Sequence, residues 1–131
     1  MPSLLICDDA VAFPVLFRRW MRDCGFDEVG QAKTAVEAVA EARQTQPDVI
    51  VVDHLLPDAT SEALVPRLRD VAPEARVLLI SGMPTDALAE LADAADVDAH
   101  MAKAATAQEM QEAVLALLPT GARPRSSAST A

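Results

Sequence analysis

The polar residues with the clearest chemical potential stand where short apolar runs end. Asp8 and Asp9 follow the run "LLIC", Asp53 follows "VIVV", Ser81 follows "VLLI", and Lys103 lies two residues past "VDAHM". Each of these residue types alone is common in turns and helix caps. Taken together they supply three carboxylates, a hydroxyl and an amine. Carboxylates that lie close together repel one another unless a cation stands between them.

This set of residue types suits the handling of a phosphoryl group. Mg²⁺ is the natural cation for a few carboxylate oxygens supplemented by water. Beside such an ion, the Asp53 carboxylate would attack phosphorus in line and become an acyl phosphate. Lys103 would neutralise phosphoryl oxygens, and Ser81 would donate a hydrogen bond to one of them.

The elements that must position these residues alternate between apolar runs and stretches of helical period. The predicted strands are Leu4–Cys7, Val29–Ala32, Val49–Val52, Val77–Ile80 and Val97–Met101. The predicted helices span about Ala10 to Cys24, Ala35 to Gln44, Thr60 to just before Pro73, just after Pro84 to Ala94, and Ala107 to Leu118. Thr34 and Glu37 predict a capping box at the start of the second helix.

This alternation predicts an α/β fold with a doubly wound, five-stranded parallel sheet. The second apolar run is weak, so its strand is expected at an edge of the sheet. In such sheets the ligand crevice lies beyond the carboxyl ends of the strands. The polar residues that follow the strands are therefore expected to meet at one edge.

The composition limits the class of partners. The chain has 131 residues, of which 51% are hydrophobic, which fits one domain, residues 1–118, followed by a disordered tail, residues 119–131. The net charge of −9 disfavours direct nucleic-acid binding and fits a basic protein partner or a bound cation. No secretory leader and no apolar run of membrane-spanning length is present, so a cytoplasmic protein without membrane contact is expected.

Four motifs, "CDDA", "VVDHLLP", "LLISG" and "HMAKAAT", occur in this order. With them the sequence resembles the receiver domain of two-component response regulators, over residues Ser3 to Leu118. The resemblance implies the flavodoxin-like (βα)5 receiver fold. It further implies a stand-alone, single-domain signalling protein that assists its own phosphorylation and is not an enzyme in the usual sense.

The resemblance also implies the roles of individual site residues. Asp53 would be the phosphoacceptor. Mg²⁺ would be held by the carboxylates of Asp8, Asp9 and Asp53 and by the backbone carbonyl of Leu55.

The phosphate-binding and switch positions of the family fall on Ser81, Lys103 and His100, the last at the place of a switching aromatic residue. The phosphoryl donor would be the phosphohistidine of a histidine kinase or a histidine phosphotransfer protein. The output would pass by contact with an unidentified downstream protein or by onward phosphotransfer. Receivers often pair through the fourth and fifth helices, so a homodimer through these helices is a further expectation.

Four positions depart from the family pattern. Ala104 follows Lys103 where the family commonly has a proline, often after a cis peptide bond. A cis bond before another residue type costs about 3 kcal/mol, so the loop after Lys103 is expected to run differently. Asp98 and Ser61 replace glycines. Pro66 lies inside the third helix, where it should remove a hydrogen bond and bend the helix.

Other functions remain open at this point. A pseudo-receiver would keep the fold without phosphorylation and act as an interaction or dimerisation module, and the missing proline, the missing glycines and His100 lend weight to it. A phosphatase with an aspartate nucleophile would typically carry a second Asp two residues later, where this chain has Leu55. A dinucleotide-binding domain would need G-x-G-x-x-G after the first strand, and the sequence has no such motif there.

Overall fold

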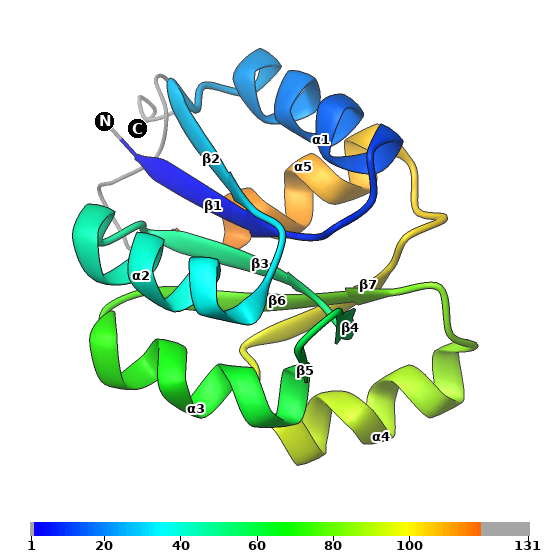
Figure 1. Cartoon of the computed structure of the whole chain (residues 1–131). Coiled ribbons are helices and arrows are strands. Elements are labelled where there is room, and N and C mark those ends of the chain that lie inside the picture. Colours follow the sequence, from blue (N-terminus) through cyan, green and yellow to red (C-terminus); the bar gives the residue numbers. More distant parts are fainter. Residues whose placement is uncertain (1, 119–131) are drawn as a thin grey trace.

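The computed structural model describes residues 2–118, in which five parallel strands form one sheet with helices on both faces (Figure 1). The strands of this sheet are β1 (Ser3–Cys7), β2 (Glu28–Ala32), β3 (Val49–Asp53), β6 (Arg76–Ser81) and β7 (Ala99–Ala102). The helices are α1 (Ala12–Asp23), α2 (Ala35–Thr45), α3 (Ser61–Val71), α4 (Thr85–Ala95) and α5 (Ala107–Ala116). The predicted disordered tail, residues 119–131, lies outside the described residues.

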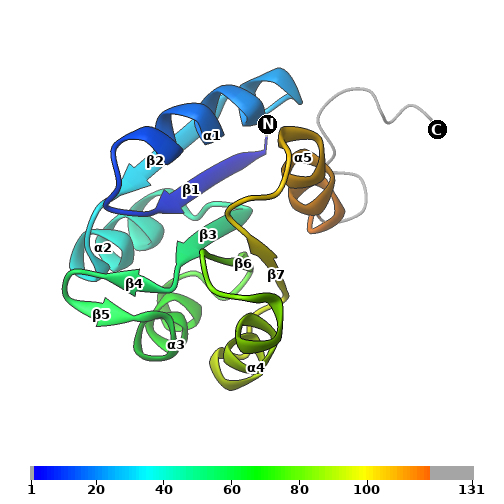
Figure 2. The same cartoon turned by 90° about the vertical axis from the view of Figure 1, so that its right-hand side faces the viewer.

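The strands are ordered β2-β1-β3-β6-β7. This order confirms the doubly wound parallel sheet, and it confirms the weak second strand at an edge. Helices α1 and α5 cover one face of the sheet, whereas α2, α3 and α4 cover the other, as both views show (Figures 1 and 2).

The core consists of two layers separated by the sheet, because successive strand residues point to opposite faces. In β1, Leu4 and Ile6 belong to the layer under α1 and α5, whereas Leu5 and Cys7 belong to the layer under α2 and α3. Burying one Leu or Ile side chain contributes about 1.5–3 kcal/mol before the opposing loss of chain entropy is counted. The sheet therefore gives the strand ends a rigid base.

Helix α4 packs on a separate, small cluster. Its buried members are Leu79 of β6 together with Leu88 and Ala92 of α4. A third buried residue of α4, Ala95, belongs to the layer under α2 and α3.

The helix starts show how local sequence fixes the element boundaries. At α5, the Thr106 hydroxyl accepts a hydrogen bond from the Glu109 N–H at 3.1 Å, and the Glu109 carboxylate accepts one from the Thr106 N–H at 2.8 Å. At α2, the capping box predicted from Thr34 and Glu37 is only half right. Thr34 accepts from the Glu37 N–H at 3.1 Å, but the Glu37 carboxylate accepts from the N–H of Lys33 at 2.8 Å.

Two local features differ from the sequence expectation. The segment after β3 forms an antiparallel hairpin of β4 (Leu55–Leu56) and β5 (Ala59–Thr60), where the sequence predicted no strand. The last strand begins at Ala99 rather than Val97, and Asp98 directly precedes it. Its carboxylate accepts from the Val77 N–H at 2.8 Å and lies 3.3 Å from an Arg69 nitrogen.

Pro66 lies inside α3, and the helix continues past it to Val71. The bend expected from the missing N–H stays a prediction. No helix among residues 2–118 is both long enough and apolar enough to span a membrane.

Candidate functional site

Four neighbouring strands bring the predicted site residues to one edge of the sheet. Asp8 follows β1, Asp53 ends β3, Ser81 ends β6, and Lys103 follows β7. The strands run parallel and are adjacent in the order β1-β3-β6-β7, so their carboxyl ends lie side by side. The pairing of Asp53 with Ile80 places the acidic residue level with the end of β6.

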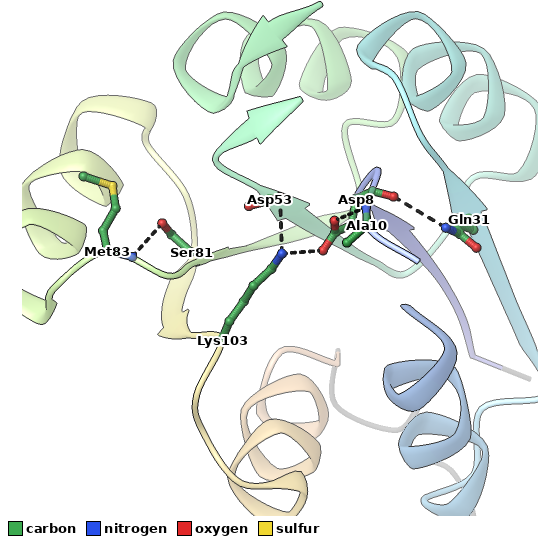
Figure 3. Close-up of polar contacts among 7 residues, drawn as sticks. All are labelled: Asp8, Ala10, Gln31, Asp53, Ser81, Met83 and Lys103. Carbon is green, nitrogen blue, oxygen red and sulfur yellow. Dashed lines mark hydrogen bonds and ion pairs between the residues drawn. The ribbon is translucent and has the colours of Figure 1, made fainter. Parts of the chain in front are cut away.

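Lys103 lies between two of the carboxylates, as Figure 3 shows. Its Nζ is 2.8 Å from Oδ2 of Asp8 and 3.4 Å from Oδ2 of Asp53. The Asp8 side chain has no exposed surface, and that of Asp53 is 15% exposed. The predicted meeting of these three side chains is thus present in the structure.

The three acidic residues form a cluster that could hold a metal ion. One carboxylate oxygen each from Asp8, Asp9 and Asp53 lies within 4.8 Å of the others. Oδ1 of Asp8 accepts a hydrogen bond from the Ala10 N–H at 2.9 Å, whereas the buried Oδ2 has no partner of hydrogen-bond geometry among the described residues. The close neighbour of this oxygen is the Lys103 ammonium at 2.8 Å, so the oxygen lies in a site suited to a cation, and all three ligands are the hard oxygens that Mg²⁺ prefers.

The electrostatics of the site disfavour a fully charged Asp53. Burial raises the pKa of Asp53 above its ordinary value, and the negative charge of Asp8 raises it further. The opposing effect of Lys103 does not cancel these two causes. Three carboxylates against one ammonium therefore leave an excess of negative charge, which a divalent cation would offset.

The same surroundings hold Lys103 in its protonated form. Burial lowers its pKa, but the interaction with Asp8 and the charge of Asp53 raise it by more, so the net pKa lies above the ordinary value. The amine is thus available as a positive charge at the pocket.

Ser81 is buried at the end of β6, and its hydroxyl is turned toward its own loop (Figure 3). The hydroxyl oxygen accepts a hydrogen bond from the Met83 N–H at 3.1 Å. No hydrogen bond between described residues joins the Ser81 side chain to Asp53 or Lys103. Because a serine hydroxyl also carries a donor hydrogen, accepting from Met83 leaves that hydrogen free for another oxygen.

Two further predicted positions have exposed side chains. The His100 side chain is exposed on β7, where the residue pairs with Leu79. Leu55 lies in β4, paired with Thr60, and its side chain is 62% exposed. The switching role of His100 and the metal-binding role of the Leu55 carbonyl stay predictions.

The loop after Lys103 keeps the amine in the site although Ala104 replaces the usual proline. Residues 2–118 contain no cis peptide bond. The Lys103 N–H donates to the carbonyl of Ser81 at 2.9 Å, and the Ala105 N–H donates to the carbonyl of Ala102 at 3.0 Å, which closes a turn. The Lys103 amine still reaches Asp8 and Asp53.

Two contacts that hold the segment after Asp53 were not predicted from the sequence. The Asp58 carboxylate accepts hydrogen bonds from the N–H groups of Ala35 at 2.7 Å and Val36 at 3.1 Å, so it caps α2. Nδ1 of His54 lies 2.9 Å from the hydroxyl of the buried Ser61, at the start of α3. Asp58 is far from α2 in sequence, although an Asp after a proline is a general turn signal. His54 and Ser61 belong to no local motif that would predict their contact.

Comparison with known proteins agrees with this geometry. The response regulator receiver domain family matches residues 4–115. The chemotaxis protein CheY of Listeria monocytogenes is 28% identical over 83 residues, which cover 63% of this chain and 70% of that protein. The photosynthetic apparatus regulatory protein RegA of Rhodovulum sulfidophilum is 34% identical over 115 residues, which cover 87% of this chain but only 62% of that protein.

A solved structure is also similar. It is a response regulator protein from Burkholderia pseudomallei with a phosphorylated aspartic acid, a calcium ion and citrate, and it shares 30% sequence identity. The TM-score is 0.76, and the match covers 92% of this chain and 68% of that chain. The chain belongs to the response regulator receiver domain family, whose members are signalling domains of two-component systems.

Proposed function

We propose that this receiver domain accepts a phosphoryl group on Asp53 from the phosphohistidine of a histidine kinase or histidine phosphotransfer protein. The observation that carries the proposal is the position of the Asp53 carboxylate. It ends a rigid strand, lies 3.4 Å from the Lys103 amine, and shares a cluster with Asp8 and Asp9. The phosphorylated aspartate of the Burkholderia protein, a relative at 30% identity, supports the same chemistry here.

The transfer would form one bond and break one. An oxygen of the Asp53 carboxylate attacks phosphorus and forms the P–O bond of an acyl phosphate. The P–N bond of the donor breaks, its electron pair stays on the imidazole nitrogen, and that nitrogen takes up a proton from water. Catalysis of such a transfer rests on positioning and on neutralising the charge of the phosphoryl oxygens.

The residues of this chain divide that work. The carboxylates of Asp8, Asp9 and Asp53, with the backbone carbonyl of Leu55, would hold Mg²⁺. A bound Mg²⁺ would supply positive charge to the phosphoryl oxygens. Lys103 carries its charge at the same pocket.

Ser81 would complete the phosphoryl-binding set. Its hydroxyl already accepts from the Met83 N–H, so its own hydrogen would be donated to a phosphoryl oxygen. That new bond would link the phosphorylation state to the β6–α4 segment. His100 would respond on the neighbouring strand, as the resemblance implies.

The partner surface we favour for the phosphodonor is α1, which stands beside the site. Three exposed apolar side chains lie on or next to this helix: Val11, Val15 and Leu16. Exposed apolar residues grouped on one element commonly mark a protein contact. The cytoplasmic location, the stand-alone organisation and the pairing through α4 and α5 stay predictions.

Phosphoryl uptake tests the proposal directly. The purified protein is incubated with Mg²⁺ and acetyl phosphate, and its intact mass is followed over time. We expect the wild type to gain the mass of one phosphoryl group and the Asp53→Asn variant to stay unmodified. Replacing Asp8 or Asp9 by Asn should slow uptake and weaken its dependence on Mg²⁺. A wild type that gains no mass would support the pseudo-receiver instead.

A further inference from the structure

Lys103 has a third neighbour besides the two carboxylates. Its Nζ lies 5.2 Å from the centroid of the Phe13 ring, which comes from the first turn of α1. This is within the range in which an ammonium group is attracted to the negative face of an aromatic ring. Phe13 is half-buried, so part of this contact is shielded from water.

The Phe13 ring is itself held in place by two other aromatic residues. It stacks on Phe17 with ring centroids 5.7 Å apart, and it meets Trp20 edge to face at 6.2 Å. Phe17 is fully buried in the core layer under α1 and α5. The ring next to Lys103 is thus anchored to the core and is not a free surface side chain.

The contact with Phe13 also differs in kind from the other two contacts of the Lys103 amine. Its two ionic partners are the carboxylates that we propose as ligands of Mg²⁺. A cation bound there would share these charges and weaken their hold on the amine. The Phe13 ring is a neutral contact that such sharing would not remove.

We propose that Phe13 is a positioning residue for the phosphoryl-transfer reaction, which keeps the Lys103 ammonium at the pocket through a cation–π contact. This proposal rests on the proposed function for its effect on phosphoryl transfer. The contact between ring and amine can be tested without phosphorylation.

The first measurement is the rate of phosphorylation by acetyl phosphate at saturating Mg²⁺. The Phe13→Leu variant keeps an apolar side chain but loses the ring, and we expect its rate constant to fall by about three- to fivefold. The Phe13→Tyr variant keeps the ring and should remain near the wild type. The Phe26→Leu variant is the matched control, because it removes a buried ring from the same core layer that forms no aromatic contact with Phe13 among the described residues.

The second measurement is an NMR signature of the contact in protein without metal or phosphodonor. Protons of the Lys103 methylene group next to Nζ should be shifted upfield by the ring current of Phe13. We expect Phe13→Leu to abolish this shift, and we expect Phe13→Tyr and Phe26→Leu to retain it. A purely structural role of Phe13 would lower the stability of both leucine variants, but it would not make them differ in the Lys103 shift.

The outcomes separate the two proposals. If the wild type takes up no phosphoryl group but shows the ring-current shift, the proposed function fails and the contact stands. If the wild type is phosphorylated and Phe13→Leu matches it in rate and in the Lys103 shift, the positioning role is overturned. If Phe13→Leu does not fold, Phe13→Met provides the same comparison, and a wild-type shift and rate in that variant would overturn the role equally.

Discussion

The ammonium of Lys103 lies 2.8 Å from Oδ2 of Asp8, a carboxylate oxygen with no other donor among the described residues. The lysine therefore occupies the place where a cation would be expected, and it stabilises a buried charge that would otherwise be unpaired. A divalent ion and the ammonium compete for this oxygen. The apo protein and the metal-bound protein should differ first in the position of Lys103.

Replacing Lys103 by Met tests this competition. The substitution leaves the buried Asp8 carboxylate without its ion pair, so the apo protein should lose about 1–3 kcal/mol of unfolding free energy. It also removes a positive charge from the metal site, so the dissociation constant for Mg²⁺ should fall by about tenfold. Thermal denaturation and Mg²⁺ titration, the latter followed by the fluorescence of Trp20, measure the two effects. Weaker Mg²⁺ binding in the variant would contradict the competition.

Replacing Asp53 by Asn should make the apo protein more stable at pH 7. Burial and the charge of Asp8 raise the pKa of Asp53, so the folded state holds this proton more tightly than the unfolded state does. The resulting loss of stability develops as pH rises through the ordinary pKa of Asp to the raised one, and it is fully present above that. We expect a gain on the order of 1 kcal/mol without metal.

Added Mg²⁺ should reverse this order, because it stabilises the wild type more than the Asn variant. Denaturation curves recorded between pH 3 and pH 8, with EDTA or with Mg²⁺, give both comparisons. An Asn variant that is less stable than the wild type at pH 7 in EDTA would show that Asp53 is satisfied by Lys103 alone.

Replacing Asp58 by Asn should weaken the link between the hairpin after Asp53 and α2. The hydrogen bonds from the N–H groups of Ala35 and Val36 lower the pKa of Asp58. Their contribution to stability is present above the ordinary pKa of Asp and is lost as pH falls through the lowered one. We therefore expect a lower melting temperature at pH 7 and a difference that shrinks on acidification. Asp70→Asn on the exposed surface of α3 is the control, and an equal loss there would argue against a specific cap.

Residues that depend on strand ends were predictable from the sequence. An apolar run can stop only where the chain leaves the core, so Asp53 and Ser81 were placed correctly by the last apolar residue before them. The parallel sheet then fixed their common edge, because right-handed crossovers leave few other arrangements. Lys103 was located in the same way, from its distance to the fifth run.

Contacts between distant segments were not predictable. Asp58 caps a helix that begins 23 positions earlier, and nothing near it in sequence indicates that partner. Asp98 looked like a departure at a glycine position, whereas its carboxylate binds the backbone of β6 and an arginine of α3. The approach of Phe13 to Lys103 likewise depends on how α1 packs across the sheet edge. Such contacts follow from the packing of elements and have no local pattern of their own.

The small apolar cluster beneath α4 has a consequence for how a signal leaves the domain. Leu88 is the one large side chain of α4 that is buried there, and its partner Leu79 lies two residues before Ser81 on β6. Burial of one leucine contributes about 2 kcal/mol, and a hydrogen bond to a charged group contributes about 1.5–3 kcal/mol. The two quantities are of similar size, so one new bond at the end of β6 could offset the contribution of Leu88, while Ala92 and Ala95 still hold α4. A bond gained at Ser81 could therefore change how α4 packs on the sheet and which surface this helix presents to a partner.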